Sequence, residues 1–189
     1  MALTFQYHGI AEAELEAARA IGAWAQVSGH RFVRLPDLKE AADIRGAEFP
    51  GLPGTYIPMR NSIFYSVAAS IAEETGAVSI VGGHNRDDIK VFDDVGDSFF
   101  AALQKAFRSG SSILGRRRLT IDRPLRALGK PEVIRLASTM RVPLGLTWSC
   151  HRDGAAPCRE CEGCLARRRS FELAKIADPL WKGRGQKIT

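Results

Sequence analysis

The sequence of 189 residues has no long apolar run. A transmembrane helix needs about 20 consecutive apolar residues, and no segment approaches that length, so we expect no membrane span. Residues 1–10 carry neither the basic start nor the apolar centre of a secretory signal. Internal repeats and low-complexity segments are also missing. We therefore expect a single globular domain over residues 1–189 that works in the reducing cytoplasm without a membrane partner.

Cysteine is scarce, and its few residues stand together. The chain has 4 cysteines, all within residues 150–164, in the spacing C-x7-C-x2-C-x2-C (Cys150, Cys158, Cys161 and Cys164). Each of the two overlapping C-x2-C motifs can direct a pair of sulfurs toward one point. Cys150 can then supply the fourth ligand from across a loop that contains Gly and Pro. Zn²⁺ prefers four tetrahedral soft ligands, and four thiolates leave no place for a catalytic water. We predict a structural zinc site in segment 148–171; disulfides or free thiols are the alternative.

Arginine is abundant around this cluster. Four thiolates around Zn²⁺ leave a net charge of about −2, which nearby arginines could offset (Arg152, Arg159, Arg167, Arg168 and Arg169). The whole chain has a net charge of +6. A basic balance suits anionic partners such as nucleotides, acidic metabolites or RNA. The run from Arg116 to Arg118 is either a solvated surface or an RNA contact.

Apolar periodicity predicts strands that alternate with helices, which is typical of an α/β protein with a parallel, doubly wound sheet. The expected strands are 3–7, 30–36, 78–81 and 119–125, and the expected helices are 11–26, 61–75, 97–108, 130–140 and 161–177. Residues 37–54 should form an irregular segment with a short helix inside it, and the basic tail 182–189 should be mobile.

Polar residues follow the most apolar of these strands. Residues 78–81 read Val-Ser-Ile-Val, and we expect this strand to be covered on both faces. The loop 82–88, Gly-Gly-His-Asn-Arg-Asp-Asp, leaves its carboxyl end. Ligands of open α/β sheets bind outside those carboxyl ends, so this loop is a candidate binding site.

Several blocks together resemble a known family. Residues 55–61 read Thr-Tyr-Ile-Pro-Met-Arg-Asn, and Gly83-His84-Asn85 precedes Asp88. Residues 92–94 read Phe-Asp-Asp, and residues 147–150 read Thr-Trp-Ser-Cys before the other cysteines. In order and spacing, from about residue 3 to residue 171, these blocks resemble the QueC family of 7-cyano-7-deazaguanine synthases.

The resemblance implies a fold and a reaction. The fold would be Rossmann-like (adenine nucleotide alpha hydrolase-like), a mostly parallel sheet with helices on both faces and a C-terminal four-cysteine zinc knot. The reaction would convert 7-carboxy-7-deazaguanine and ammonia into the nitrile with ATP and Mg²⁺, in queuosine and deazapurine biosynthesis. The family's habit also implies a homodimer.

One family feature does not occur in these 189 residues. The family's phosphate loop, an S-G-G-x-D-S run after the first strand, is absent, and Ser109-Gly110-Ser111-Ser112 lacks the Asp. Residue 3 begins where the family's second strand would begin. Three explanations stay open: the start of the chain was cut or misassigned, a separate chain supplies the loop, or the protein has lost ATP chemistry. The last two would make it a partner-dependent or non-catalytic deazapurine- or nucleotide-binding zinc scaffold.

The resemblance also implies five binding residues. Arg60, Asn61, Asn85, Asp88 and Asp94 would line the nucleotide or substrate pocket, with Asp94 on the substrate or on Mg²⁺. An arginine can hold a carboxylate or phosphate with two hydrogen bonds, and a carboxylate with an amide suits a guanine-like edge. Alternatively, Asn61 is only a helix cap, Arg60 a surface charge, and the 82–88 loop merely solvated. His84 has no partner that the sequence identifies.

Overall fold

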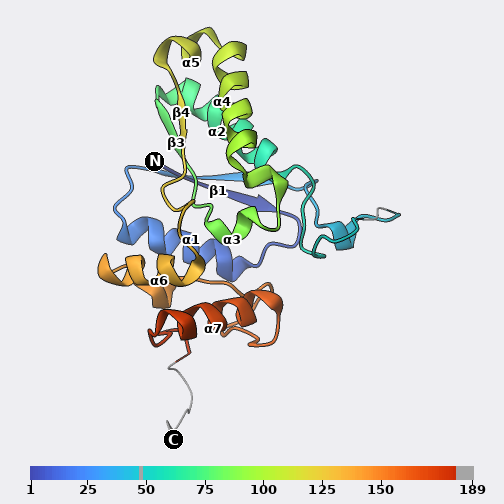
Figure 1. Ribbon diagram of the computed structural model, residues 1–189, viewed down its shortest axis with the longest axis vertical. Coiled ribbons are helices and arrows are strands. Elements are labelled where there is room, and N and C mark those ends of the chain that lie inside the picture. Colours follow the sequence, from blue (N-terminus) through green and yellow to red (C-terminus); the bar gives the residue numbers. More distant parts are fainter. Residues whose placement is uncertain (47–48, 182–189) are drawn as a thin grey trace, which may run out of the picture. The chain divides into compact units, whose positions relative to one another are not determined.

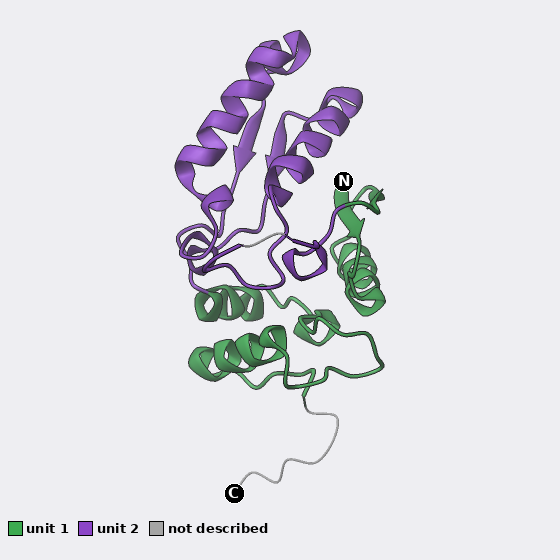
Figure 2. Cartoon of the chain, turned by 90° about the vertical axis from the view of Figure 1, so that its right-hand side faces the viewer, with its two compact units in different colours: residues 1–37, 130–189 green, residues 38–129 purple. Residues whose placement is uncertain are grey.

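A computed structural model describes residues 1–46 and 49–181 (Figure 1). The prediction for the tail 182–189 lies outside these residues. The chain divides into two compact units, which Figure 2 colours separately. Unit 1 comprises residues 1–37 and 130–189, and unit 2 comprises residues 38–129.

The N-terminal part of unit 1 is a β-α-β segment. Strand β1 (Ala2–Tyr7) pairs in parallel with β2 (His30–Leu35), and helix α1 (Glu12–Trp24) connects them. The register runs from Ala2 opposite His30 to Tyr7 opposite Leu35. Leu15 anchors α1 with only 1% of its surface exposed. This segment matches the predicted first strand, helix and second strand closely.

The C-terminal part of unit 1 carries the cysteines. It contains α6 (Lys130–Thr139), the 3-10 turn η3 (Leu144–Leu146) and α7 (Glu162–Ala174). Helix α6 packs against α7, and α1 contacts η3. Helix α7 buries Cys164, Phe171 and Ala174. The periodicity predicted both helices, although α7 ends three residues earlier than expected.

Unit 2 contains a second pair of parallel strands, β3 (Ser79–Val81) and β4 (Thr120–Asp122), with Ile80 opposite Ile121. Its longer helices are α2 (Arg60–Thr75) and α4 (Asp97–Gly110). The shorter elements are η1 (Ala41–Asp43), α3 (Arg86–Ile89), η2 (Asp93–Val95) and α5 (Ser112–Arg117). The 3-10 turn η1 is the short helix expected within residues 37–54.

Two groups of buried side chains form the core of unit 2. One consists of Ala69, Ala72, Leu114 and Leu119, and the other of Tyr65, Val95 and Phe100. Ile80 of β3 and Phe107 of α4 pack against both groups. Strand β3 and helix α4 therefore join the two groups into one core.

The α/β class with parallel strands and helices is confirmed, but two details of the prediction are wrong. Strand β4 ends at Asp122, because Pro124 lacks an N–H for a sheet and residues 123–128 turn instead. Val78 and Val81 are 55% and 67% exposed, so the strand is not covered on both faces. Side chains of a strand alternate, and in β3 the core contacts only Ile80.

Helices α3 and α5 were not predicted, since each is too short to show a periodic pattern. Helix α3 occupies part of the loop expected at residues 82–88. In the part of the chain that the structure describes, no helix combines the length and apolarity needed to cross a membrane.

Candidate functional site: a four-cysteine metal centre and a polar cluster beside β3

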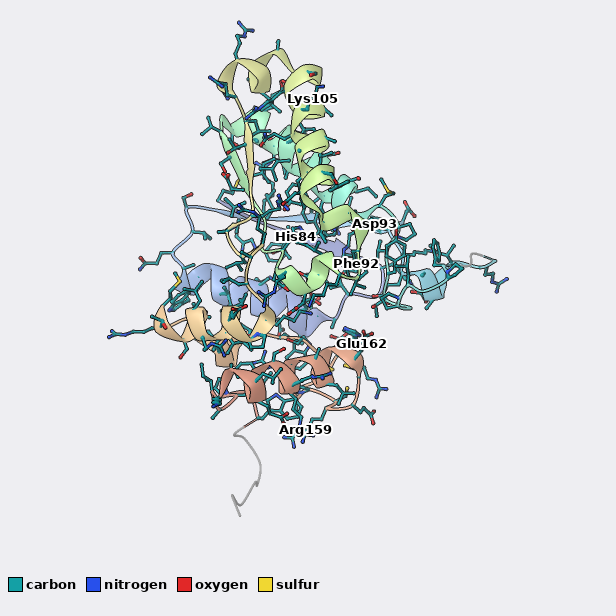
Figure 3. The ribbon with its side chains drawn as sticks, viewed as in Figure 1. His84, Phe92, Asp93, Lys105, Arg159 and Glu162 are labelled. Carbon is teal, nitrogen blue, oxygen red and sulfur yellow. The ribbon has the colours of Figure 1, made fainter. Side chains whose placement is uncertain are left out.

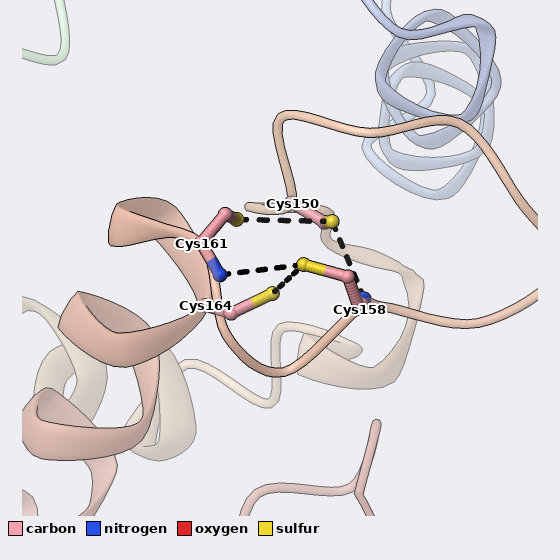
Figure 4. Close-up of side chains that lie close together, drawn as sticks. All are labelled: Cys150, Cys158, Cys161 and Cys164. Atoms are coloured by element: carbon pink, nitrogen blue, oxygen red, sulfur yellow. Dashed lines mark hydrogen bonds between the residues drawn. The ribbon is translucent and has the colours of Figure 1, made fainter.

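The four cysteines converge on one point of unit 1 (Figure 4). Cys161 precedes the first turn of α7, and Cys164 lies within it. All four sulfur atoms lie within 4.8 Å of one another. The Cys158–Cys164 and Cys150–Cys161 sulfurs are each 3.9 Å apart. Four Zn–S bonds of about 2.3 Å in a tetrahedron require sulfurs about 3.8 Å apart, so the cluster fits such an ion.

The disulfide alternative does not describe this structure. All four cysteines are free thiols, and a disulfide needs sulfurs about 2.05 Å apart. Within residues 1–46 and 49–181, this is the one group of three or more His, Cys, Asp or Glu side chains close enough to hold an ion. The cluster is therefore able to bind a metal through four thiolates, with no coordination position left for a reacting water.

Backbone N–H groups stabilise the sulfurs. Cys150 Sγ accepts hydrogen bonds from the N–H groups of Arg152 and Cys158, both at 3.4 Å, and Cys158 Sγ accepts one from Cys161 N–H at 3.3 Å. Backbone donors at Glu160 and Cys161 lower the pKa of Cys158 to about 6. Burial raises the pKa of Cys164. The N–H donors favour the thiolate form that a metal requires.

Most of the nearby arginines have other partners. Arg152 pairs with Glu160 at 2.5 Å, and Arg168 pairs with Glu172 at 2.9 Å. The guanidinium of Arg159, labelled in Figure 3, lies 5.2 Å from the centre of the Trp181 ring. The pKa of Arg152 is raised first by Glu160 and also by Cys158 and Cys161, so its charge acts on the thiolates while it pairs with Glu160.

Arg167 joins the two segments that deliver the cysteines. It lies on α7 one turn after Cys164 and is 8% exposed. Its Nη1 donates to the carbonyl of Thr147 at 3.1 Å and to the Thr147 hydroxyl at 2.7 Å, and its Nη2 donates to the carbonyl of Leu144 at 3.0 Å. Thr147 precedes Cys150 by three residues, so Arg167 fixes the approach of Cys150 to α7.

Gly163 allows a second close approach between the same segments. A Cβ atom at Gly163 would stand 2.0 Å from the carbonyl oxygen of Ser149 and 2.9 Å from Nε2 of His151. The backbone oxygen of Ser149 cannot move as a flexible side chain could. Only glycine therefore fits between Cys161 and Cys164 in this arrangement.

In unit 2, the polar cluster surrounds His84, just beyond the carboxyl end of β3 (Figure 3). The imidazole stacks on the ring of Tyr65 at 5.9 Å and lies 5.3 Å from the ring of Phe100. Burial lowers the pKa of His84 below 6.5; Asp88 and Asp94 oppose this shift, while Arg60 and Arg123 add to it. Three of the predicted binding residues, Arg60, Asp88 and Asp94, thus act on one imidazole.

The other two predicted binding residues, Asn61 and Asn85, donate hydrogen bonds to Asp94 and Asp88 of this cluster. The backbone N–H of Asn61 donates to Oδ2 of Asp94 at 3.2 Å, so Asp94 caps the start of α2. The alternative that Asn61 is only a helix cap is wrong: Met59 is the N-cap, with φ of 54°, and Asn61 is buried within the first turn. The side chain of Met59 makes no capping hydrogen bond, so an N–H group in the first turn needs an acceptor from outside the helix. Asp94 provides that acceptor for Asn61.

Asn85 and Asp88 form a capping box at the start of α3. The side chain of Asn85 accepts from the N–H of Asp87 at 2.9 Å and donates to Oδ2 of Asp88 at 2.7 Å. The two predicted guanine-reading groups are therefore adjacent, and each orients the other.

Sequence reasoning missed His84, Tyr65 and Arg123 in this cluster. Tyr65 reads as an ordinary apolar position of α2, and Arg123 lies in a segment expected to be strand. Only the loop position of His84, after a strand with two glycines, could have indicated it. Asp88 and Asp94 follow His84 closely in sequence, but Tyr65 and Arg123 come from α2 and from the residue after β4, which are distant in sequence.

Comparisons with known proteins agree on one family. The family model described as "Queuosine biosynthesis protein QueC" matches residues 1–175. The 7-cyano-7-deazaguanine synthase of Thermoplasma acidophilum is 40% identical over 129 residues, which cover 68% of this chain and 54% of that protein. The synthase of Oceanobacillus iheyensis is 32% identical over 191 residues, covering 94% of this chain and 84% of that protein.

Coverage of the relatives is uneven. The chain spans only 54% and 60% of the lengths of the synthases from Thermoplasma acidophilum and Sulfurimonas denitrificans, the latter 38% identical over 137 residues. The match nevertheless extends over nearly all of this chain, including the four cysteines and the polar loop after β3. The chain belongs to the QueC family of queuosine biosynthesis proteins.

Proposed function

We propose that this chain acts in 7-cyano-7-deazaguanine synthesis, converting 7-carboxy-7-deazaguanine and ammonia into the nitrile at the expense of ATP. The observation that carries the proposal is the family match over residues 1–175, together with relatives named as this synthase. The activity is that of an ATP-dependent ligase that forms a C–N bond.

The chemistry requires an activated carboxylate. Oxide is a poor leaving group, so ATP must first convert the carboxylate to an acyl adenylate, whose AMP leaves when ammonia attacks. A second adenylation, on the amide oxygen, allows elimination to the nitrile. The site must orient the acid and keep out water, which would hydrolyse the adenylate. We propose that Arg60, Asn61, Asn85, Asp88 and Asp94 line the pocket that does this.

Phosphate binding needs a further segment. The 189 residues contain no S-G-G-x-D-S run, and backbone N–H groups at the start of a helix are the usual cradle for a pyrophosphate. For the proposed activity, a strand, loop and helix with that run would come from additional residues of the same chain or from a separate chain. Mg²⁺ would accompany the bound ATP, with Asp94 as the candidate carboxylate.

We propose that the metal of the cysteine cluster is Zn²⁺ and that its role is structural. Cys150, Cys158, Cys161 and Cys164 would hold it, and a bound ion would link the loop after η3 to α7. The sulfur spacing of 3.9 Å supports a tetrahedral ion. Because the thiolates fill the coordination sphere, the metal would supply no Lewis acid for the reaction.

The remaining partners are expectations from the family and from charge. We propose a homodimer working in the cytoplasm. The run from Arg116 to Arg118 is exposed and could contact RNA through phosphates.

A test of the proposal is ATP–pyrophosphate exchange with 7-carboxy-7-deazaguanine, followed by detection of the nitrile by mass spectrometry. The chain is assayed alone and with a polypeptide that carries the S-G-G-x-D-S loop. We expect exchange that depends on the carboxylated substrate and on the loop. No exchange under either condition would contradict the synthase and leave a binding scaffold as the function.

A further inference from the structure

Two buried polar atoms of unit 2 have no hydrogen-bond partner among the described residues: the hydroxyl of Tyr65 and Nε of Arg123. Tyr65 is 6% exposed, and the side chain of Arg123 is 10% exposed. Buried side-chain polar groups nearly always have a partner, so an unpaired one requires an explanation. Two such groups in one cluster favour a shared explanation.

Both groups are held against the same ring. The Tyr65 and Phe100 rings meet edge to face with centres 4.8 Å apart, and Cζ of Arg123 lies 4.5 Å from the centre of Phe100. The charge of Arg123 acts on the Tyr65 hydroxyl. The two donors therefore belong to one site and are fixed by packing on Phe100.

The other nitrogens of Arg123 are already engaged. Nη2 donates to Oδ1 of Asp97 at 2.6 Å, and Nη1 donates to the carbonyl of Val95 at 3.3 Å. These bonds fix the plane of the guanidinium and leave Nε as its nitrogen without a hydrogen-bond partner. Asp97 is 78% exposed, so its carboxylate is largely solvated and this ion pair contributes little to stability.

The site stands at the edge where parallel sheets bind ligands. Arg123 is the first residue after β4, and Gly82 is the first residue after β3. The Tyr65 hydroxyl lies over Gly82, where a Cβ atom would be only 1.8 Å from it. The carboxyl ends of parallel strands are the usual ligand edge of an open α/β sheet.

We propose that Tyr65 and Arg123 form a subsite that binds one oxyanion of a substrate, with the Tyr65 hydroxyl and Arg123 Nε as its two donors. A carboxylate or phosphate oxygen accepts from both groups, and hydrogen bonds to a charged acceptor are stronger than neutral ones. The inference rests on the proposed function, which offers two such oxyanions: the 7-carboxylate of the deazaguanine and a phosphate of the nucleotide.

Binding measured by titration calorimetry tests the subsite in the full chain. The probes are 7-carboxy-7-deazaguanine, 7-cyano-7-deazaguanine, which lacks the carboxylate, and inorganic phosphate. The variants are Tyr65→Phe, which keeps the ring and removes the hydroxyl, and Arg123→Lys, which keeps the charge and removes Nε. Arg126→Lys, an exposed arginine of the same segment, is the matched control. Circular dichroism confirms folding, and Tyr65→Phe alone suffices if Arg123→Lys does not fold.

We expect both variants to bind an oxyanion probe at least about 10-fold more weakly. Arg126→Lys should leave the affinity for that probe unchanged. If the variants lose affinity for the carboxylated compound but not for the nitrile, the oxyanion in the subsite is the 7-carboxylate. If they lose affinity for phosphate, the oxyanion is a phosphate of the nucleotide. Phosphate binding that depends on Arg123, without any deazaguanine binding, supports the subsite and contradicts the proposed function. Deazaguanine binding that survives both variants supports the function and overturns the subsite, and failure of every probe to bind overturns both.

Discussion

Arg167 and Asp178 form a bidentate ion pair inside unit 1, with Nε to Oδ2 at 2.6 Å and Nη2 to Oδ1 at 2.8 Å. Their side chains are 5% and 7% exposed. The carboxylate also accepts from the N–H of Leu180 at 3.0 Å. The pair ties the segment after α7 to the same guanidinium that holds the approach to Cys150.

Replacing Arg167 should destabilise unit 1 strongly. Arg167→Met leaves the carboxylate of Asp178 buried without its partner, and removal of one partner of a buried pair costs about 3–5 kcal/mol. Urea unfolding measures the loss. The control is Arg168→Met, on the same helix, because the pair of Arg168 with Glu172 is exposed and should contribute at most about 1 kcal/mol. Equal losses in the two variants would show that Arg167 acts no differently from a surface charge.

Substitution of Gly163 should disturb the metal cluster. Gly163→Ala places a Cβ atom 2.0 Å from the Ser149 carbonyl oxygen, so the two segments must separate. We expect weaker metal retention, read by a colorimetric zinc assay after dialysis against a chelator, and a lower melting temperature. Gly145→Ala is the control, because its Cβ atom would meet only Pro179, at an ordinary 3.5 Å. Wild-type zinc retention in Gly163→Ala would contradict the close approach.

Metal removal should unfold the C-terminal part of unit 1. We expect one zinc per chain after dialysis and none in Cys161→Ser, whose serine cannot replace a thiolate. Structural zinc contributes apparent energies of about 10–16 kcal/mol in small finger peptides, so even a fraction of that is large beside a net stability of about 5–15 kcal/mol. Thermal melts of wild type, chelator-treated wild type and Cys161→Ser check this, and added zinc should rescue only the wild-type chain. A zinc-free variant that melts like the parent would falsify the structural role.

His84 should make unit 2 sensitive to acid. Its pKa is lowered mainly by burial, so between that lowered value and 6.5 the unfolded chain binds a proton that the folded chain does not. The stability associated with the neutral imidazole is present above pH 6.5 and falls as the pH drops below it. Urea unfolding between pH 7.5 and pH 5 should show a steeper loss for wild type than for His84→Asn. Identical pH dependence in the two proteins would contradict this account.

The cysteine centre could be predicted almost entirely from the sequence. Its ligands lie within 15 residues, and local spacing alone aims their sulfurs at one point. Periodicity likewise predicted the strands of unit 1 and the long helices α2, α4, α6 and α7, because one buried face repeats with each turn. The short helices α3 and α5 could not be predicted, since they are too short to show a period.

The polar cluster of unit 2 could be predicted from local sequence patterns only in part. The sequence indicated Asn85 and Asp88, whose capping box is local, but gave no reason to connect His84 with Tyr65, Phe100 and Arg123. Those residues meet only because the ends of two parallel strands and the start of α4 are brought together by packing on Ile80 and Phe107.

The sequence by itself determined the family, the metal ligands and the alternation of strands with helices, because each depends on residue type and short-range spacing. Tertiary structure alone decided which polar groups share a site and which remain unpaired. Burial and hydrogen bonding of Tyr65, Arg123 and Arg167 depend on contacts across tens of residues, and no local pattern encodes such contacts.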